Sequence, residues 1–281
     1  MSLKRHLKEL KVYRPLPKFP PISVTGKGCF LNCKHCGRKY LLGMLHASQS
    51  NLYEIVKNLV EKEEINGILI SGGLDSELKI PLPWEIIKKI KRDFELKVNV
   101  HVGFIDKKDI EKLVEAEVDV VSLDFVSDNK VIEEIYGIKK NVNDYIEIMM
   151  GLEDENVPYA PHVTIGLDWG KIHWEFNAIR YLSKRKAKVT VFNILIPTKG
   201  TMMEKVKPPS NREIRELFIY ARKMLSDKEL SLGCMRPRNV GYEILAIESE
   251  FDRMVLPRNE TLEKARKMYN KITFHDLCCV I

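Results

Sequence analysis

The sequence lacks several features that would place it among membrane, exported or multidomain proteins. No stretch approaches the roughly 18 uninterrupted apolar residues that a membrane span requires. Residues 1–21 interleave Lys and Arg with Leu and contain no apolar segment of the secretory type. There is no internal repeat, low-complexity segment or Gly/Ser linker at which separate domains would divide. We therefore expect a cytoplasmic protein with no membrane insertion.

No large excess of charge of either sign is present. The 281 residues include 46 Lys plus Arg and 39 Asp plus Glu, a formal net charge of +7, and 44% of residues are hydrophobic. The basic residues form no long block and do not interleave with aromatic residues as in single-stranded nucleic-acid binders. We expect no nucleic-acid partner, whereas a modest positive charge favours an acidic protein partner.

Cysteine is scarce and unevenly distributed. Because no export signal is present, six cysteines are better explained as metal ligands or reactive thiols than as a disulfide framework. Three of them form a compact CxxxCxxC array, and three lie in the last fifth of the sequence. They are Cys29, Cys33 and Cys36, followed by Cys234, Cys278 and Cys279.

Short β-branched runs alternate with longer stretches of helical periodicity, a pattern typical of parallel βα units. Residues 52–60 have apolar side chains at helical spacing, and Ser210 with Glu213 forms a capping box before another such stretch. The expected strands are 22–25, 67–71, 97–102, 118–124, 159–166, 188–196, 229–235 and 251–256.

Eight strands with seven or eight intervening helices predict an α/β fold, either a (β/α)8 barrel or a closely related partial (β/α) barrel. We expect the barrel to span residues 22–256. An N-terminal extension of residues 1–21 precedes it, and a C-terminal helix with a cysteine-containing tail, residues 257–281, follows it. Barrel active sites lie at the carboxyl ends of the strands, so the chemistry should be sought in the loops there.

The CxxxCxxC array follows the first expected strand directly. Three close cysteines can hold three irons of a 4Fe-4S cluster and leave the fourth iron without a protein ligand. A structural zinc site formed by Cys29, Cys33, His35 and Cys36 is the alternative. It is disfavoured because His35 and Cys36 are neighbours in sequence and no second CxxC pair follows.

This array, its position after the first strand, and Gly72-Gly73 after the second strand resemble the radical S-adenosylmethionine (radical SAM) superfamily. The resemblance implies that the open iron binds S-adenosylmethionine, whose one-electron reduction yields methionine and a 5′-deoxyadenosyl radical. It implies that Gly72 and Gly73 face the cofactor's amino group, although the usual acidic residue is displaced here to Asp75. It also implies that His35 lies against the adenine; an ordinary exposed imidazole is the alternative.

From residue 118 onward the sequence resembles the biotin synthase and lipoyl synthase branch. Asp124 ends the fourth expected strand where biotin synthase has Asn-x-Asp, which implies contact with ribose hydroxyls or the substrate; an acidic helix cap is the alternative. Residues 231–233 resemble strand seven of biotin synthase, where the next residue is an arginine that ligates an auxiliary cluster. Here Cys234 follows, and Arg236 is expected on the same face of the strand.

The remaining thiols suggest a second cluster. If the tail folds back over the barrel mouth, Cys234, Cys278 and Cys279 would ligate a second iron-sulfur cluster, with Arg236, water or substrate as the fourth ligand. Such a cluster would supply sulfur to a carbon radical. The alternative is that Cys234 is a small buried apolar residue and that the two tail cysteines are disordered or redox-sensitive.

The whole pattern most resembles the two-protein lipoyl synthases of archaea. This resemblance implies sulfur insertion into an octanoyl chain on an acylated lipoyl carrier domain. A second radical SAM subunit and an electron donor such as ferredoxin would be partners. One alternative is a radical SAM methyltransferase, mutase or dehydrogenase that acts on a small-molecule substrate without sulfur insertion. Another is a non-catalytic iron-sulfur or zinc scaffold.

Overall fold

The computed structural model describes residues 7–281 and contains one continuous sheet in which every strand pair is parallel. The spatial order is β11-β1-β10-β9-β8-β7-β6-β5-β4-β2-β3. The strands are β1 Leu7–Tyr13, β2 Pro21–Ser23, β3 Leu45–His46, β4 Gly67–Ser71, β5 Lys97–His101, β6 Val120–Asp124, β7 Tyr159–Ile165, β8 Val189–Ile194, β9 Glu229–Leu232, β10 Arg253–Val255 and β11 Tyr269–His275.

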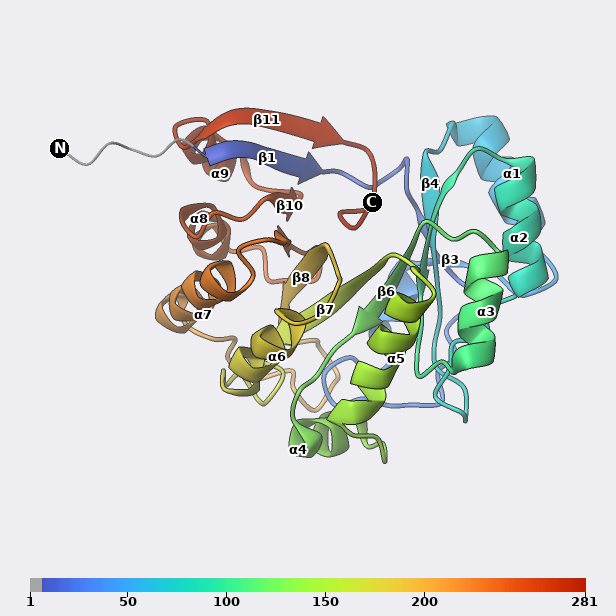
Figure 1. The fold of residues 1–281 in the computed structure, drawn as a ribbon, viewed down its shortest axis with the longest axis horizontal. Coiled ribbons are helices and arrows are strands. Elements are labelled where there is room, and N and C mark those ends of the chain that lie inside the picture. Colours follow the sequence, from blue (N-terminus) through green and yellow to red (C-terminus); the bar gives the residue numbers. More distant parts are fainter. Residues whose placement is uncertain (1–6) are drawn as a thin grey trace.

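Helices follow most strands and cover the outer face of the sheet (Figure 1). They are η1 Lys39–Gly43, α1 Leu52–Glu63, α2 Trp84–Asp93, α3 Lys107–Glu115, α4 Asn129–Val131, η2 Ile132–Tyr136, α5 Val142–Asp154, α6 Trp174–Leu182, α7 Asn211–Met224, α8 Val240–Glu248 and α9 Asn259–Ala265. No helix among the described residues is long and apolar enough to cross a membrane.

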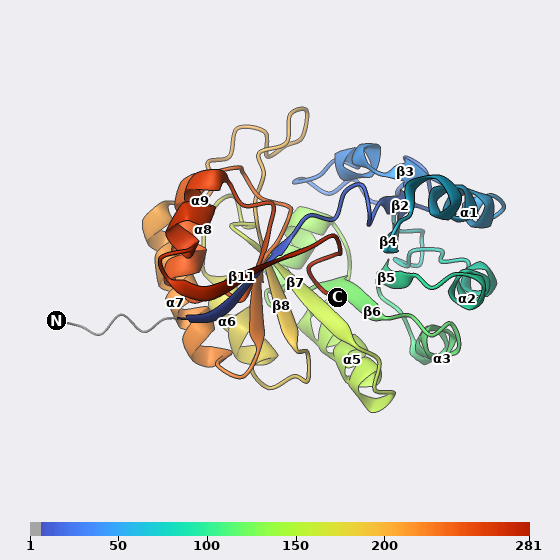
Figure 2. The ribbon, with the colours of Figure 1, turned by 90° about the horizontal axis from the view of Figure 1, so that it is seen from above.

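The sheet curves around a central lumen without closing, as the view from above shows (Figure 2). Helices α1 to α3 cover one side of the curve and α6 to α9 the other, while the chain's end lies inside it. Within residues 7–281, no pairing joins β3 to β11, so the sheet is an open half barrel. The predicted partial (β/α) barrel is confirmed.

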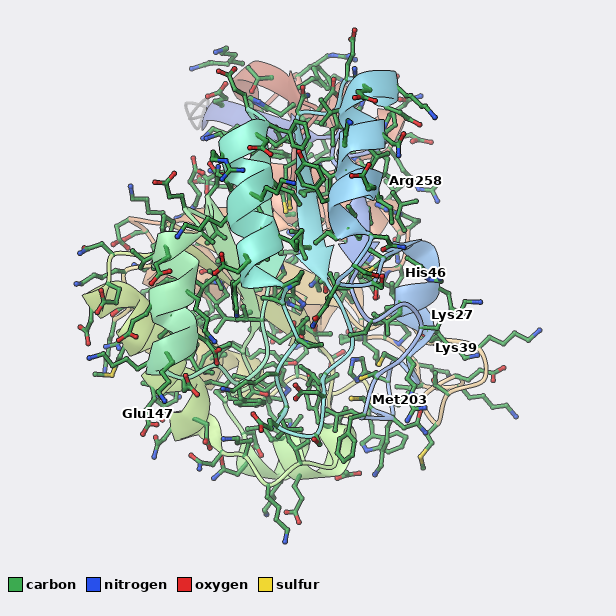
Figure 3. All side chains as sticks on the ribbon, turned by 90° about the vertical axis from the view of Figure 1, so that its right-hand side faces the viewer. Lys27, Lys39, His46, Glu147, Met203 and Arg258 are labelled. Atoms are coloured by element: carbon green, nitrogen blue, oxygen red, sulfur yellow. The ribbon has the colours of Figure 1, made fainter. Side chains whose placement is uncertain are left out.

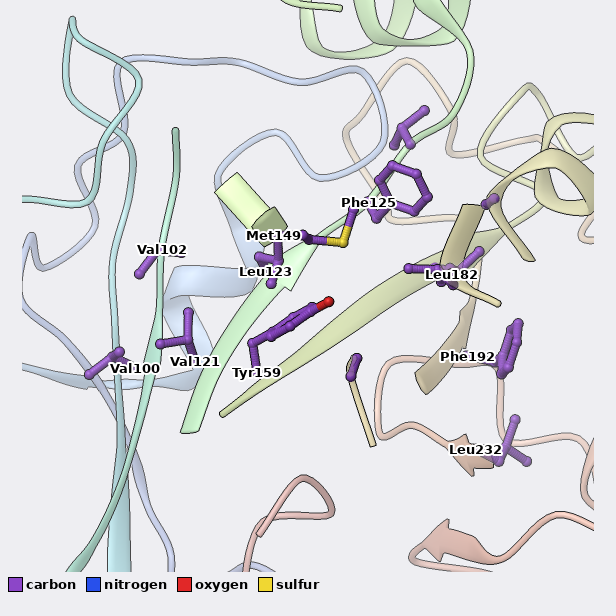
Figure 4. Packing of buried hydrophobic residues seen from close by; sticks show 14 of the residues in the cluster. Val100, Val102, Val121, Leu123, Phe125, Met149, Tyr159, Leu182, Phe192 and Leu232 are labelled. Atoms are coloured by element: carbon purple, nitrogen blue, oxygen red, sulfur yellow. The ribbon is translucent and has the colours of Figure 1, made fainter. Parts of the chain in front are cut away.

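Alternate residues of β6 face opposite sides of the sheet, one toward the helices and the core, the other toward the lumen. Val121 and Leu123 are buried against the outer helices, where Met149 of α5 also packs (Figure 4). Ser122 and Asp124 occupy the alternate positions and therefore face the lumen. The same period of two places polar side chains of the neighbouring strands in the lumen.

Local sequence signals account for several helix boundaries. The Ser210 side chain accepts a hydrogen bond from the Glu213 amide, and the Glu213 carboxylate accepts from the Ser210 amide. This reciprocal arrangement satisfies two backbone N–H groups at the start of α7. The predicted capping box is therefore confirmed.

Two strands lie outside the predicted barrel boundaries. β1 comes from the expected N-terminal extension and lies between β10 and β11. β11 comes from the expected C-terminal tail, and α9 corresponds to the helix expected there. Both flanking segments therefore belong to the same sheet as the barrel strands.

Candidate functional site

The cysteine loop follows β2 and is fixed to the loop that follows β4. The Gly73 amide donates to Thr25 Oγ1 over 2.7 Å, and the Phe30 amide donates to the Leu74 carbonyl over 2.7 Å. Thr25 Oγ1 also donates to the Gly28 carbonyl over 2.8 Å. The two loops therefore form one unit at the carboxyl end of the strands.

Gly73 is required by close packing against the cysteine loop. A Cβ atom at this position would lie 2.0 Å from the Gly28 carbonyl oxygen and 2.5 Å from the Cys29 Cα. Such distances are far below van der Waals contact, so only glycine fits without a backbone shift. At Gly72 the nearest contact would be 3.1 Å, to Thr25 Oγ1. The structure thus connects the glycine pair to the position of Cys29.

The three thiols of the array influence one another. Cys33 is buried, and its thiol forms a hydrogen bond with the thiol of Cys36. This bond lowers the pKa of Cys36 to about 7 and, together with burial and the charges of Cys36 and Cys29, raises the pKa of Cys33. The Cys36 and Gly37 amides donate to the Cys33 carbonyl, which makes a tight turn. The loop therefore places the Cys33 and Cys36 thiols in contact, with Cys29 close enough to affect the pKa of Cys33.

His35 and Asp124 lie next to this array. The His35 ring makes an edge contact with Tyr136, with ring centres 5.4 Å apart, and its buried Nδ1 has no partner among the described residues. Burial lowers the pKa of His35 to about 4, so the ring is neutral near pH 7. The charge of Asp124 acts on the pKa values of His35, Cys36 and Tyr136. Asp124 therefore faces the same space as the array.

Asp75 has a local structural role. Its side chain accepts hydrogen bonds from the Glu77 and Lys79 amides over 2.9 and 3.0 Å. These contacts stabilise the turn after Gly73.

The chain after β11 enters the lumen from the end opposite to the cysteine loop. Cys279 and Val280 are buried against residues that lie near the amino ends of their strands, such as Val120, Ala160 and Val189. The second cluster was conditional on a tail folded back over the barrel mouth, and the tail does not lie there. The tail instead closes the amino-terminal end of the half barrel, where apolar side chains provide a site for it.

Hydrogen bonds from the barrel wall hold this tail. Arg253 Nη1 donates to the main-chain oxygens of Cys279 and Ile281, each over 2.8 Å. Asn99 Nδ2 donates to Cys278 Sγ over 3.5 Å, and Ser122 Oγ donates to Asn99 Oδ1 over 3.0 Å. Cys278 is thereby anchored to the lumen face of β5.

Cys234 lies close enough to the tail thiols to affect their ionisation. The charge of Cys278 raises the pKa of Cys234, second only to the effect of burial, and Cys234 raises the pKa of Cys279. A hydrogen bond from Cys279 lowers the pKa of Cys278 to about 7. The Cys234 side chain is nevertheless accessible to water.

Arg236 differs from its predicted placement. β9 ends at Leu232, so Cys234 and Arg236 lie in the following loop rather than on one strand face. The Arg236 guanidinium is buried, forms an ion pair with Glu243 over 2.8 Å, and donates to the carbonyls of Gly233 and Val255. Nη1 and Nη2 of Arg236 thus connect the loop to α8 and β10, whereas its buried Nε has no partner among the described residues, and these contacts do not support the prediction that Arg236 is a cluster ligand or catalytic group.

Several lumen residues were missed in the sequence analysis. The rings of His101 and His162 are 6.0 Å apart between centres. Asn193 Oδ1 is buried and has no partner among residues 7–281. A period-two pattern on each strand would have placed Asn99, His101 and His162 on the inner face. The strands are short and mostly apolar, so the period-two pattern of their few polar residues was not recognised.

The first array offers three thiols on one loop, a donor set that suits an iron-sulfur cluster. Among the described residues, no three His, Cys, Asp or Glu side chains converge closely enough to hold one metal ion. Thiolates are the usual ligands of iron-sulfur clusters, and a multi-iron cluster needs more widely spaced ligands than one ion. Gly73 also leaves the backbone beside Cys29 free of a side chain. The predicted zinc alternative gains no support.

Comparison with known families agrees with this site. Residues 23–175, slightly more than half of the chain, match the family described as the radical SAM superfamily. This region contains the three-cysteine loop, the glycine pair and Asp124. No curated protein matches the sequence.

Solved structures share the fold at low sequence identity. Methylornithine synthase has a TM-score of 0.64 and 13% identity, over 90% of this chain and 73% of that one. The FeFe-hydrogenase maturase HydG from Carboxydothermus hydrogenoformans has a TM-score of 0.68 and 17% identity, over 93% and 67%. Streptococcus suis SuiB bound to S-adenosylmethionine has a TM-score of 0.59 and 13% identity, over 79% and 50%. The chain thus spans only about half the length of SuiB.

Proposed function

This chain belongs to the radical SAM superfamily, and we propose that it inserts sulfur at an unactivated C–H position, as in lipoyl synthesis on an octanoylated carrier domain. Membership implies a 4Fe-4S cluster and S-adenosylmethionine, which together supply a 5′-deoxyadenosyl radical. The observation that carries the proposal is the position of the tail thiols inside the half barrel, where Cys278 Sγ accepts a hydrogen bond from Asn99 and Cys279 is buried against the barrel wall.

Residues at the carboxyl ends of the strands would hold the cofactors. Cys29, Cys33 and Cys36 would bind the first cluster, and Gly73 leaves room for the cofactor's amino group beside it. His35 is half-buried and neutral near pH 7, which suits contact with an adenine ring. Asp124 is a hydrogen-bond acceptor that would bind ribose hydroxyls or the substrate.

The second cluster would be bound by Cys234, Cys278 and Cys279. Replacement of a C–H bond by a C–S bond requires a sulfur atom near the carbon that has lost its hydrogen atom. The tail thiols enter from the amino ends of the strands, whereas the first array lies at the carboxyl ends. A substrate in the lumen would therefore lie between the two sets of thiols.

The polar lumen favours a second candidate function. A hydrocarbon chain in contact with Asn193 would leave its buried Oδ1 without a partner, which is unfavourable. His101 and His162 add further polar groups to the same space. This observation favours a radical SAM methyltransferase, mutase or dehydrogenase that acts on a polar small molecule.

A basic rim suggests how a protein substrate would dock. The loops spanning residues 26–46 and 197–207 contain seven Lys or Arg residues and one acidic residue. They lie side by side, since Tyr40 Oη is 3.4 Å from Thr198 Oγ1, and Figure 3 shows Lys27, Lys39 and Met203 on the same side of the molecule. The rim consists of Lys27, Lys34, Arg38, Lys39, Lys199, Lys205 and Lys207.

An acidic carrier domain is the partner we propose for this rim, because complementary charge favours association. The exposed Phe30, Leu42 and Met202 in the same loops offer apolar contacts. A second radical SAM subunit and a ferredoxin-type electron donor remain proposed partners on the sequence resemblance alone.

An anaerobic assay tests the proposed function. Reconstituted protein with dithionite, S-adenosylmethionine and an octanoylated lipoyl-domain peptide should yield 5′-deoxyadenosine and a thiolated peptide. Replacing Cys29, Cys33 and Cys36 by Ala should abolish 5′-deoxyadenosine. Replacing Cys278 and Cys279 by Ala should retain it but abolish thiolation.

Two outcomes would contradict parts of the proposal. Absence of S-adenosylmethionine cleavage by the wild-type protein would favour the scaffold alternative. Cleavage without thiolation, with or without a second subunit, would favour the methyltransferase, mutase or dehydrogenase alternative.

A further inference from the structure

We propose that Trp169 is a positioning residue for the first cluster, because its indole holds the half of the cysteine loop that contains Cys33 and Cys36. Trp169 lies at the tip of the loop that follows β7, residues 166–173, which we call the β7 loop. The inference goes beyond sulfur insertion, since it concerns only the first cluster, which membership of the superfamily implies.

The backbone at the tip of the β7 loop has a conformation that Trp does not favour. Trp169 and Gly170 both have positive φ, 49° and 85°. The Lys171 amide donates to the Asp168 carbonyl over 2.8 Å, so residues 168–171 make a turn of the I′ type. Asn-Gly or Asp-Gly is the usual central pair of such a turn, and a bulky side chain at positive φ is strained. The turn itself therefore gives no reason for Trp at this position.

Contacts of the indole with the cysteine loop and η2 provide that reason. Trp169 Nε1 donates to Glu134 Oε1 over 2.6 Å, and the Lys34 ammonium lies 5.5 Å from the centre of the ring. Lys34 Nζ is also 3.7 Å from the same Glu134 oxygen. The indole thus meets a cation over its face and an acceptor at its N–H, and Trp makes both interactions well. These contacts compensate for the strain in the backbone.

Lys34 connects the indole to the cluster ligands. It lies between Cys33 and Cys36 in the sequence, and its amide donates to the Ile135 carbonyl over 2.9 Å. Both its backbone and its side chain are therefore attached to η2. The Cys36 amide donates to the Cys33 carbonyl, which closes a tight turn around Lys34. A shift of Lys34 would therefore move both thiols.

The rest of the β7 loop is fixed, so its tip is a firm support for the indole. At the base of the loop, the Glu175 carboxylate accepts from the amides of Gly166 and His173 over 2.7 and 2.9 Å. At the tip, a Cβ atom on Gly170 would lie 2.2 Å from the Lys207 carbonyl oxygen. The tip thus packs tightly against the segment that precedes α7. Contacts outside the cysteine loop therefore set the position of the indole.

Trp169→Asn separates the role of the indole from the stability of the fold. Asn-Gly is the preferred centre of a I′ turn, so the urea midpoint of the cluster-free protein should equal or exceed that of the wild type. Alkylation of Cys33 and Cys36 by iodoacetamide should nevertheless accelerate about tenfold, because a strong hydrogen bond no longer opposes local opening. Alkylation of Cys29 should not change, because that residue packs against Gly73.

The reconstituted holoprotein provides a second measurement. Anaerobic transfer of iron from the cluster to a ferrous chelator should be faster in Trp169→Asn than in the wild type. Glu134→Ala removes the acceptor of the indole N–H and should give the same increases in iron transfer and in alkylation. The double variant should not exceed either single variant, because each substitution removes the same interaction.

Glu117→Asn is the matched control. Glu117 also has a positive φ, 51°, and is exposed in the turn between α3 and β6. This turn leads into the amino end of β6, away from the cysteine loop at the carboxyl ends of the strands. The control variant should therefore leave alkylation and iron transfer unchanged.

The possible results decide between a positioning role and a general structural role. Unchanged alkylation of Cys33 and Cys36 in Trp169→Asn would show that the indole does not hold the cysteine loop. Equal acceleration at Cys29, with a lower urea midpoint, would show that Trp169 acts only on the stability of the fold. Wild-type protein that binds no iron would overturn the link to a cluster, and the alkylation rates would then test the contact with the loop alone.

Discussion

At the residue scale, the close approach at Gly73 yields the most direct prediction. Gly73→Ala places a Cβ where the Gly28 carbonyl and Cys29 already lie. Relief of that overlap requires a shift of the cysteine loop, at a cost of about 1–3 kcal/mol in the free energy of unfolding. We expect less iron in the first site and weaker binding of S-adenosylmethionine, measured by iron analysis and equilibrium dialysis.

Gly43→Ala is the control for this prediction. An added Cβ at Gly43 would meet no atom within 4 Å. This variant should bind iron and S-adenosylmethionine as the wild type does. Equal behaviour of the two variants would show that the contact between Gly73 and the cysteine loop is unimportant.

Residue types with distinctive chemistry were predictable from the sequence, whereas their partners were not. The spacing of Cys29, Cys33 and Cys36 placed them on one loop, and the structure brings them together. Arg236 was assigned to the lumen because a strand was extended past Leu232. Its ion pair with Glu243 depends on where α8 packs, which no local pattern specifies.

At the element scale, Arg253 is the residue that fixes the tail in the lumen. Its guanidinium is nearly buried, pairs with Glu229, and donates to Cys279 and Ile281. Arg253→Ala removes these charge-assisted bonds and leaves Glu229 with fewer partners. We expect a loss of about 3 kcal/mol in the free energy of unfolding.

Release of the tail should be measurable apart from stability. In Arg253→Ala, we expect alkylation of Cys278 and Cys279 in cluster-free protein to accelerate and total bound iron to fall by about half. Total iron should halve because the variant would lose one of two clusters that contain the same number of irons. Arg212→Ala, on the exposed face of α7, is the control and should change neither quantity. An unchanged alkylation rate in Arg253→Ala would show that the apolar contacts alone hold the tail.

Asp119 joins the start of β6 to α2 and β5 and gives a pH-dependent prediction. It forms ion pairs with Lys91 and Lys97 over 2.6 and 2.7 Å and accepts from the Val98 amide. Burial raises the pKa of Asp119, but these hydrogen bonds outweigh that effect, so its pKa is lowered overall. The native state therefore favours the ionised carboxylate.

A lowered native pKa means that this stabilisation is present above the unfolded pKa of about 3.9 and is lost as pH falls through the native value. Asp119→Asn should reduce the free energy of unfolding by about 2 kcal/mol at pH 7. Urea denaturation should show that the difference from wild type shrinks below about pH 4. A difference that is constant down to pH 3 would exclude the ion pairs as its source.

Central strands were predictable because they are apolar on the helix side, whereas the edge strands were not. β4 and β8 are almost wholly buried, and their apolar runs were recognised. β11 lies at an edge of the sheet and is mostly accessible, so its sequence contains Asn, Lys and His. Exposure removes the hydrophobic signal on which strand prediction depends.

At the scale of the whole molecule, the half barrel admits ligands from two ends with different properties. The carboxyl end has the cysteine loop and the basic rim, and the amino end is closed by the tail. The topology causes this separation of the two thiol sets, because parallel strands place all their carboxyl ends at one end of the barrel. The sequence order alone did not reveal it, since Cys278 and Cys279 are remote in sequence from the residues that they contact.

The basic rim yields a prediction about the proposed protein substrate. Lys199→Glu, Lys205→Glu and Lys207→Glu together reverse three of its seven positive charges. We expect the Kd for an acidic octanoylated carrier domain, measured by calorimetry at low salt, to rise at least about tenfold, or about 1.4 kcal/mol. Salt should reduce the difference because exposed charges are screened. Binding of a short octanoyl-lysine peptide should not change, since it does not span the rim.

A charge-matched variant separates this local effect from the effect of net charge. Lys62, Lys184 and Lys223 are exposed at or just after the C-terminal ends of α1, α6 and α7, which lead into the amino ends of the next strands, away from the two rim loops. Their replacement by Glu changes the net charge by the same amount, so any effect common to both variants reflects long-range attraction. A larger rise in Kd for the rim variant places the carrier at the cysteine end of the barrel, where its acyl chain would enter the lumen. Equal effects of the two variants would show that the rim is not the docking surface.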